Sequence, residues 1–435
     1  MQTWNAAWDL GPDFVPKGRY LDRAFFELEL ERLWPRVWQI ACRLDQLAEP
    51  GRYFEYTIGD QSILLVRVDA QRIKAFFNAC RHRGTRLASG CGRFEGGRIR
   101  CPFHGWTWKL DGSNANVFLR DEFAPLGEGD LRLRECKVDT WGGFVFINMD
   151  PDAPPLAQAI APATRHIDPV RLETQGVLWH KVVELPINWK AGLEAFTESY
   201  HVPATHPEYP QLGTDISKFV YHDDGAGHSH YGVPLSGGDA PSGLSDVDER
   251  DVFYRYVSYT IDQIGAMYVE RDRHVAARLR HAQLEPGQSV GAAFMEESYA
   301  YAAEVGIQLP AITAQQAEHL GGNFVFPNFF CLPLVGNCLA YRSRPNGMDH
   351  GSTIWDVWSL TAYPEDAPLP PYQTRYVDWR DPAQIGRVLN QDFSNMLEVS
   401  VGMRSRGFEG AKLNLRQERA ILLMHQEVDR YLRRA

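Results

Sequence analysis

Two short segments of this chain each place a cysteine close to a histidine. CRHRG contains Cys80 and His82, and CPFHGWTW contains Cys101 and His104. Thiolates and neutral imidazoles are metal ligands, and two tight loops from neighbouring hairpins can face each other across one metal centre. The first constraint on the fold is therefore a metal-binding centre built from residues 80–104.

The pairing of the ligands distinguishes two kinds of metal centre. Structural zinc sites of the Cys2His2 type normally pair cysteine with cysteine and histidine with histidine. Mixed pairs suit a two-iron cluster, in which one iron takes both cysteines and the other takes both histidines. A structural zinc site stays open as the alternative.

The two segments resemble the Rieske [2Fe-2S] motif, C-x-H followed by C-x2-H. The flanking residues also fit the form of this motif in Rieske-type ring-hydroxylating oxygenases: Arg83, Gly84, Gly105 and Trp106. The resemblance implies a cluster held by Cys80, His82, Cys101 and His104, with histidines near the surface where electrons can pass. The other cysteines lack paired histidines, and we expect them to be small core residues: Cys42, Cys91, Cys136, Cys331 and Cys338.

The length, charge and composition of the chain limit the classes of protein to which it can belong. A chain of 435 residues has room for two or three domains, and its net charge of −10 argues against a nucleic-acid binder. The first residues lack the pattern of a signal peptide, and no apolar run is long enough to span a membrane. We therefore expect a soluble cytoplasmic protein, in which clustered cysteines bind metal rather than form disulfides.

Periodicity divides the chain into a β-rich part and a mixed part. Residues 19–36 have helical spacing, and residues 51–150 contain short β runs separated by glycine turns. The Pro- and Ala-rich segment 149–162 marks a boundary. Beyond it we expect three antiparallel strands at 324–334, 337–345 and 352–364. We also expect helices at 383–403 and 414–433, and an irregular loop at 207–250.

A second metal site is predicted in NWKAGLEAFTESYHVPATH, residues 188–206. Glu194, Glu198 and His201 have the spacing of one helix face. Pro203 should interrupt that helix, so that His206 can return toward His201. Two histidines supply two of the three ligands of a 2-His-1-carboxylate iron site.

Asp392 is the candidate for the missing carboxylate. It lies on the apolar stripe of a predicted helix, and a carboxylate that faces a core is costly unless it is paired or bound to a cation. A buried ion pair with arginine is the alternative for this residue alone. Together with His201 and His206, metal ligation is the better interpretation.

This region is similar to the oxygenase catalytic domain of the same family, in NWK, E-x-Y-H-x4-H and the later D-x2-N-M. The resemblance implies that His201, His206 and Asp392 bind mononuclear iron(II). It also implies that Glu198 hydrogen-bonds a ligand histidine and bridges to the Rieske histidine of a neighbouring subunit, where the family more often has aspartate. An ordinary solvated helix position is the alternative for Glu198.

The resemblance spans about residues 20–430 and implies an α+β architecture. An antiparallel β Rieske domain at 45–155 would be inserted in a helix-grip catalytic domain formed by 1–44 and 156–435. The chain would be the catalytic alpha subunit of an oxygenase that hydroxylates an aromatic substrate with O2. A demethylase or monooxygenase acting at a non-ring position, and a Rieske electron carrier without oxygenase activity, are the alternatives.

The resemblance also implies partners. Because the sequence has no G-x-G-x-x-G fingerprint, NAD(P)H would act only through a separate reductase or ferredoxin. A homotrimer, with or without a small beta subunit, is expected. We interpret His228 and His230 as solvated loop residues and Trp189 and Tyr200 as core residues, and leave open whether Arg342 and Arg344 bind a substrate carboxylate.

Overall fold

The computed structural model describes residues 4–232 and 248–433, and the chain divides into two compact units. One unit comprises residues 30–159, here called the β unit. The other comprises residues 1–29 and 160–435, here called the α+β unit. Among the described residues, no helix has both the length and the apolar composition that crossing a membrane requires.

The β unit is built on a seven-stranded antiparallel sheet in the order β2-β11-β10-β5-β4-β3-β6. Its strands are β2 (Gln39–Arg43), β3 (Arg52–Ile58), β4 (Gln61–Arg67), β5 (Ile73–Phe77), β6 (Cys91–Arg93), β10 (Glu135–Trp141) and β11 (Phe144–Asn148). The unit begins earlier than the predicted range of 45–155, because β2 pairs with β11 in the same sheet.

A smaller three-stranded sheet completes the β unit. It consists of β7 (Arg98–Arg100), β8 (Thr107–Lys109) and β9 (Asn114–Asn116), and α3 (Glu128–Leu131) follows it. Trp106 and Trp108 are buried beside Leu64 and Phe76 of the larger sheet. This shared apolar core holds the two sheets together.

The α+β unit is organised around an eight-stranded sheet in the order β13-β14-β15-β16-β17-β18-β12-β19. All pairs are antiparallel except that of β12 with β19. The strands are β12 (Gly176–Leu185), β13 (Val220–Gly225), β14 (His228–Gly232), β15 (Asn323–Val325), β16 (Phe329–Leu334), β17 (Asn337–Asn346), β18 (Asp349–Thr361) and β19 (Thr374–Tyr376). β1 (Phe14–Pro16) pairs separately with β20 (Gly410–Lys412).

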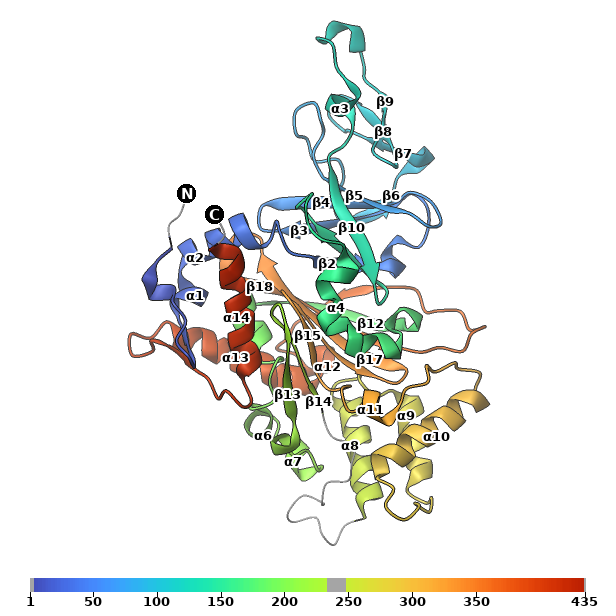
Figure 1. Ribbon diagram of the computed structural model, residues 1–435. Coiled ribbons are helices and arrows are strands. Elements are labelled where there is room, and N and C mark those ends of the chain that lie inside the picture. Colours follow the sequence, from blue (N-terminus) through green and yellow to red (C-terminus); the bar gives the residue numbers. More distant parts are fainter. Residues whose placement is uncertain (1–3, 233–247, 434–435) are drawn as a thin grey trace. The chain divides into compact units, whose positions relative to one another are not determined.

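Helices pack against the apolar residues of this sheet. α5 (Trp189–Glu194) contacts β17 and β18, and the ring of Phe393 in α13 (Arg387–Met403) packs against Trp355 of β18. α8 (Glu249–Gln263), α9 (Glu270–Leu279) and α10 (Val290–Glu304) pack on one another, as the yellow ribbons of Figure 1 show. α14 (Arg419–Leu432) contacts β13 and β14. The other helices are α4 (Leu156–Ile167), α6 (Val202–Thr205), α7 (Glu208–Gln211), α11 (Ala314–Ala317) and α12 (Pro382–Ile385).

The α+β fold class is confirmed, but several predicted elements are wrong in detail. The helix predicted at 19–36 is broken at Asp22, whose extended backbone separates α1 (Gly18–Leu21) from α2 (Arg23–Leu28). Gly386, with a φ of 100°, separates α12 from α13. The loop predicted at 207–250 contains α7 and the β13–β14 hairpin, and its residues 233–247 lie outside the described part of the chain.

Candidate metal centres and substrate cavity

The two Cys/His segments fold into loops of the same shape in the β unit. The N–H of Gly84 donates to the carbonyl of Cys80 at 2.9 Å, and the N–H of Gly105 donates to the carbonyl of Cys101 at 3.1 Å. Both glycines have a positive φ, 77° for Gly84 and 72° for Gly105, which side chains with a Cβ rarely adopt. The glycines are therefore required by the turns that carry the four candidate ligands.

Each loop buries its thiol and directs its imidazole toward the surface. Cys80 and Cys101 are buried, whereas His82 is half-buried and His104 is exposed. Their imidazole centroids lie 4.7 Å apart. Burial alone would raise the pKa of Cys101, but hydrogen bonds from the backbone N–H groups of Phe103 and His104 lower it below its usual value. Two thiols and two imidazoles in this arrangement fit the donor set of a [2Fe-2S] cluster with mixed ligands.

The second candidate site brings together residues from a loop and a distant helix of the α+β unit. Nε2 of His206 lies 2.8 Å from Oδ1 of Asp392, and Nε2 of His201 lies 3.6 Å from the same oxygen. One ligand atom from each of these three residues lies within 4.8 Å of the others. Their donor set fits a 2-His-1-carboxylate metal site.

The local structure differs from the predicted single helix. α5 ends at Glu194, and His201 precedes α6, in which Pro203 occupies the first turn and does not end a helix. Proline is favoured there because the first N–H groups of a helix have no intrahelical acceptor. Glu194 consequently does not share a face with His201, and its carboxylate lies 2.8 Å from Nε2 of His425.

Two side chains hydrogen-bond the candidate histidine ligands at Nδ1, the ring nitrogen that does not face Asp392. Oε1 of Glu198 lies 2.7 Å from Nδ1 of His201, and Oε1 of Gln391 lies 3.0 Å from Nδ1 of His206. Burial alone would lower the pKa of His201, but the hydrogen bond and charge of Glu198 raise it. Gln391 cannot be identified from the sequence, because only its position before Asp392 distinguishes it from other helix residues.

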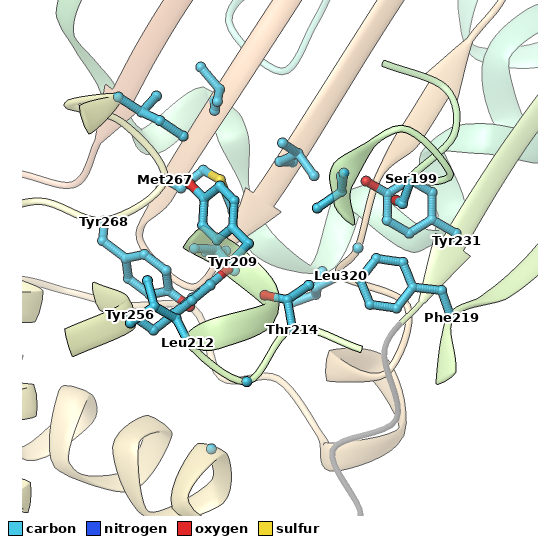
Figure 2. A pocket seen from close by; sticks show the side chains of 18 of the residues that line it. Ser199, Tyr209, Leu212, Thr214, Phe219, Tyr231, Tyr256, Met267, Tyr268 and Leu320 are labelled. Atoms are coloured by element: carbon cyan, nitrogen blue, oxygen red, sulfur yellow. The ribbon is translucent and has the colours of Figure 1, made fainter. Parts of the chain in front are cut away.

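These residues open onto a cavity of about 620 Å³. His201, His206 and Asp392 line one part of it, and aromatic and aliphatic side chains line most of the remainder. Figure 2 shows that Tyr209, Tyr256 and Tyr268 lie together on one side, with Phe219 and Tyr231 on the other. Burial raises the pKa of Tyr256 to about 12, so this phenol is neutral at physiological pH.

The structure corrects several interpretations of individual residues. His228 and His230 are buried strand residues, not solvated loop residues, because the β13–β14 hairpin packs both rings inward. Tyr200 is 54% exposed and is therefore not a core residue, whereas Trp189 is buried as predicted. Cys91 is exposed, so it is not a core residue either, in contrast to the other four cysteines without histidine partners.

Arg342 does not line the cavity. Its guanidinium donates to Oδ2 of Asp356 at 2.6 Å, and His180 lies 3.0 Å from the other oxygen of that carboxylate. Arg344 reaches only 4.0 Å from Asp356 and is also absent from the cavity wall. Neither arginine is placed to bind a substrate carboxylate in this cavity.

Known proteins resemble both units. Residues 37–123 match the family model described as Rieske [2Fe-2S] domain, and residues 172–434 match that described as ring hydroxylating alpha subunit (catalytic domain). The carnitine monooxygenase oxygenase subunit of Acinetobacter pittii is 32% identical over 201 residues, which is 45% of this chain and 53% of that protein. Choline monooxygenase, chloroplastic, of Beta vulgaris is 32% identical over 201 residues, 45% of this chain and 44% of that protein. The aligned region thus spans about half the length of these curated relatives.

Solved structures resemble the whole chain in fold. A quaternary ammonium Rieske monooxygenase in complex with L-carnitine has a TM-score of 0.64 at 18% identity and covers 97% of each chain. Naphthalene 1,2-dioxygenase from Rhodococcus sp. has a TM-score of 0.62 at 18% identity, with 96% of this chain and 94% of that chain covered. With the match of the catalytic-domain model over residues 172–434, these findings establish that the chain belongs to the ring-hydroxylating alpha subunit family and carries a Rieske [2Fe-2S] domain.

Proposed function

We propose that the chain is the terminal oxygenase component of a Rieske oxygenase system. The observation that carries this proposal is the convergence of His201, His206 and Asp392 on the wall of a large aromatic cavity. Iron(II) bound there would supply the reductive activation of O2, with electrons drawn from a [2Fe-2S] cluster at Cys80, His82, Cys101 and His104. An electron carrier would need neither the second donor set nor the cavity.

The chain's own residues then have separate tasks at this site. Nδ1–H of His206 donates to the Gln391 side chain, which directs Nε2 of His206 toward Asp392. Glu198 fixes His201 in the same way from its Nδ1 side. Such partners set the tautomer and orientation of metal-binding histidines, so they keep the three donors aimed at one point.

We infer that the substrate is a quaternary ammonium compound that is hydroxylated at a non-ring carbon. A quaternary nitrogen has no N–H to donate, and it is recognised by the faces of aromatic rings. Rings of this kind are grouped in the cavity: the centroid of Tyr256 lies 5.7 Å from that of Tyr209 and 6.0 Å from that of Tyr268. The names of the carnitine, glycine betaine and choline monooxygenases support the same substrate class.

Hydroxylation of an aromatic ring, with one or two oxygen atoms inserted, is the second candidate. Apolar side chains that could pack against a flat hydrocarbon face the same cavity, among them Phe330, Leu332 and Leu339. The two candidates differ in the charge of the substrate. They can therefore be separated by comparing charged and neutral compounds of the same shape.

Electron supply requires partners under this proposal. His104 is exposed and Phe103 beside it is 57% exposed, which leaves the histidine side of the cluster loops accessible to a ferredoxin or reductase. We propose a homotrimer in which Glu198 bridges toward the cluster histidine of a neighbouring subunit. A small beta subunit is compatible with the same arrangement.

Oxygen uptake by the iron-loaded protein tests the proposed function. With a reduced ferredoxin and reductase, choline, glycine betaine and carnitine should stimulate oxygen uptake more than benzoate or naphthalene does. Asp392→Ala should remove this uptake and leave the visible Rieske spectrum unchanged, since Asp392 lies outside the β unit. Full activity in Asp392→Ala would contradict the role of Asp392, and uptake with none of the compounds would contradict the assigned substrate classes.

A further inference from the structure

A cluster of histidines lies apart from the two centres described above. His166 is near the end of α4, His222 and His230 are paired across β13 and β14, and His319 follows α11. None of the four lines the substrate cavity. The neighbour of His230 in the strand, Tyr231, does line it, so the alternation of the strand directs His230 to the opposite side.

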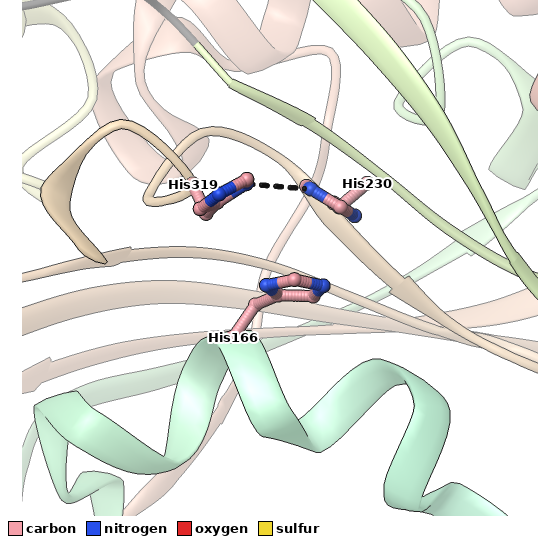
Figure 3. Close-up of side chains that lie close together, drawn as sticks. All are labelled: His166, His230 and His319. Carbon is pink, nitrogen blue, oxygen red and sulfur yellow. Dashed lines mark hydrogen bonds between the residues drawn. The ribbon is translucent and has the colours of Figure 1, made fainter. Parts of the chain in front are cut away.

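Three of these imidazoles have the spacing of metal ligands. Nε2 of His230 lies 3.0 Å from Nδ1 of His319, and one ring nitrogen from each of His166, His230 and His319 lies within 4.8 Å of the others. Figure 3 shows the three rings facing a common point from three separate segments. Tetrahedral zinc holds nitrogens at about 2.1 Å, which separates two ligand nitrogens by about 3.4 Å. The 3.0 Å between the nitrogens of His230 and His319 needs only a small expansion to admit such an ion, and a ring nitrogen of His166 lies within 4.8 Å of both.

We propose that His166, His230 and His319 form an additional metal site that binds a divalent transition-metal cation of the zinc class. Three neutral imidazoles match the ligand preference of zinc, and a water molecule completes the tetrahedron. The site lacks a carboxylate ligand, which distinguishes it from the donor set of His201, His206 and Asp392.

Asp224 supports two of the three ligands. Its Oδ2 accepts a hydrogen bond from Nδ1 of His230 at 2.8 Å, which leaves Nε2 of His230 directed at the site. Its Oδ1 lies 3.3 Å from Nε2 of His166. The side chain of Asp224 is only 1% exposed, so its negative charge is little screened and offsets the charge of a bound cation.

Arg165 occupies one nitrogen of His166 and would have to move when a cation binds. Its Nε donates to Nε2 of His166 at 2.8 Å, and its Nη2 donates to Asp224 at 3.0 Å. A neutral imidazole has one N–H, so His166 binds a cation through Nδ1 only when Arg165 releases Nε2; this nitrogen then carries the proton and can donate to Oδ1 of Asp224, 3.3 Å away. The guanidinium is 60% exposed, so solvent screens much of its repulsion toward that cation.

His222 provides a matched control. Its ring stacks on that of His230 at a centroid distance of 4.4 Å and an angle of 12°. Parallel stacking places its nitrogens beside the His230 ring and not in front of Nε2. We therefore expect His222 to contribute packing without binding the metal.

A cation at this site would cross-link two segments that carry residues of the cavity wall. His230 and His319 each precede a cavity residue, Tyr231 and Leu320 respectively. The N–H of Tyr231 also donates to the carbonyl of Gly322 at 2.8 Å, so the strand and the loop are already joined at one point. Coordination of one cation by both His230 and His319 would add a second link between the strand and the loop, on the side away from the cavity. This link would restrict movement of the cavity wall.

Zinc binding by the 435-residue chain tests the site. The double variant His206→Ala/Asp392→Ala removes two donors of the proposed iron site, so zinc retained after gel filtration reports on other sites. Metal analysis should find about one zinc ion per chain in this background. Adding His319→Ala should abolish its retention, and adding His222→Ala should not.

Two results would overturn the site: no zinc retained by the double variant, or equal retention after His319→Ala is added. An unchanged Rieske spectrum reports that the β unit is intact, and circular dichroism reports the folding of the α+β unit. If His319→Ala does not fold, His166→Gln makes the same comparison, because that side chain is partly exposed and its loss leaves little empty space. The readout is zinc content, so it is independent of whether the proposed oxygenase activity is found.

Discussion

Oε1 of Glu198 lies 2.7 Å from Nδ1 of His201, on the side of the imidazole away from the nitrogen that faces Asp392. The other carboxylate oxygen accepts hydrogen bonds from the backbone N–H groups of Tyr200 and His201. The side chain of Glu198 is therefore held within the loop and only 7% of the residue is exposed. This position excludes the interpretation of Glu198 as an ordinary solvated residue.

Glu198→Gln should weaken iron binding about 10- to 100-fold, because the amide keeps the size of the side chain but loses the charge that makes His201 a stronger ligand. Glu198→Asp is the control, since it keeps the charge and should retain more iron than the amide variant does. Iron content after dialysis against a weak chelator measures both effects. Equal iron retention in Glu198→Gln and the unmodified protein would show that the carboxylate has no such role.

The cluster loops and the catalytic family could be predicted from the sequence because their ligands are close together in the chain. Cys80 and His82 lie in one turn, and the turn itself requires Gly84. His201 and His206 are also local, so their spacing was informative even though the predicted helix was wrong. Asp392 was identified through its place on an apolar stripe, where an acidic side chain needs a partner.

Residues that matter through distant packing could not be predicted in this way. Gln391 contacts His206 across 185 positions of sequence, and His319 contacts His230 across 89 positions. Nothing in either local pattern indicates these contacts. The hairpin β13–β14 cannot be recognised from the sequence, because its glycines and acidic residues are typical of loops and only pairing with β15 makes it part of the sheet.

Asp356→Ala should lower the free energy of unfolding by about 3–5 kcal/mol, because it leaves the buried charge of Arg342 without its partner. Burial alone would raise the pKa of Asp356, but Arg342 and His180 hold it well below its ordinary value. The stabilisation is therefore present above the unfolded pKa of about 3.9 and is lost as the pH falls through the folded pKa.

Urea unfolding at neutral pH measures the effect of Asp356→Ala. Asp378→Ala is a matched control, because Asp378 forms an ion pair with Arg380 in which both side chains are more than half exposed. Removing that exposed pair should change stability by less than about 1 kcal/mol. Similar losses in the two variants would contradict the role assigned to the buried pair.

Glu194 should make stability fall as the pH rises from about 4.5 to about 7. Burial raises the pKa of this carboxyl from 4.5 to about 7, although Tyr20 donates a hydrogen bond to it. Within this window the folded protein keeps the proton that the unfolded chain releases, so raising the pH favours unfolding by up to about 3 kcal/mol. Glu194→Gln should remove this part of the pH dependence, which unfolding measured at several pH values can detect. An unchanged slope would show that Glu194 titrates normally.

Tyr256→Ala should raise the KM for a quaternary ammonium substrate about 2- to 30-fold, because it removes one aromatic face from the group formed with Tyr209 and Tyr268. Tyr256→Phe keeps that face and should change KM little. Choline should be compared with its neutral analogue, in which carbon replaces nitrogen, by measuring oxygen uptake at varied concentration. If a cation–π interaction binds the substrate, Tyr256→Ala should raise the KM for choline more than it raises the KM for the neutral analogue. Equal losses for the two compounds would instead favour the neutral aromatic substrate, since the cavity would then be selecting shape and apolar surface without charge.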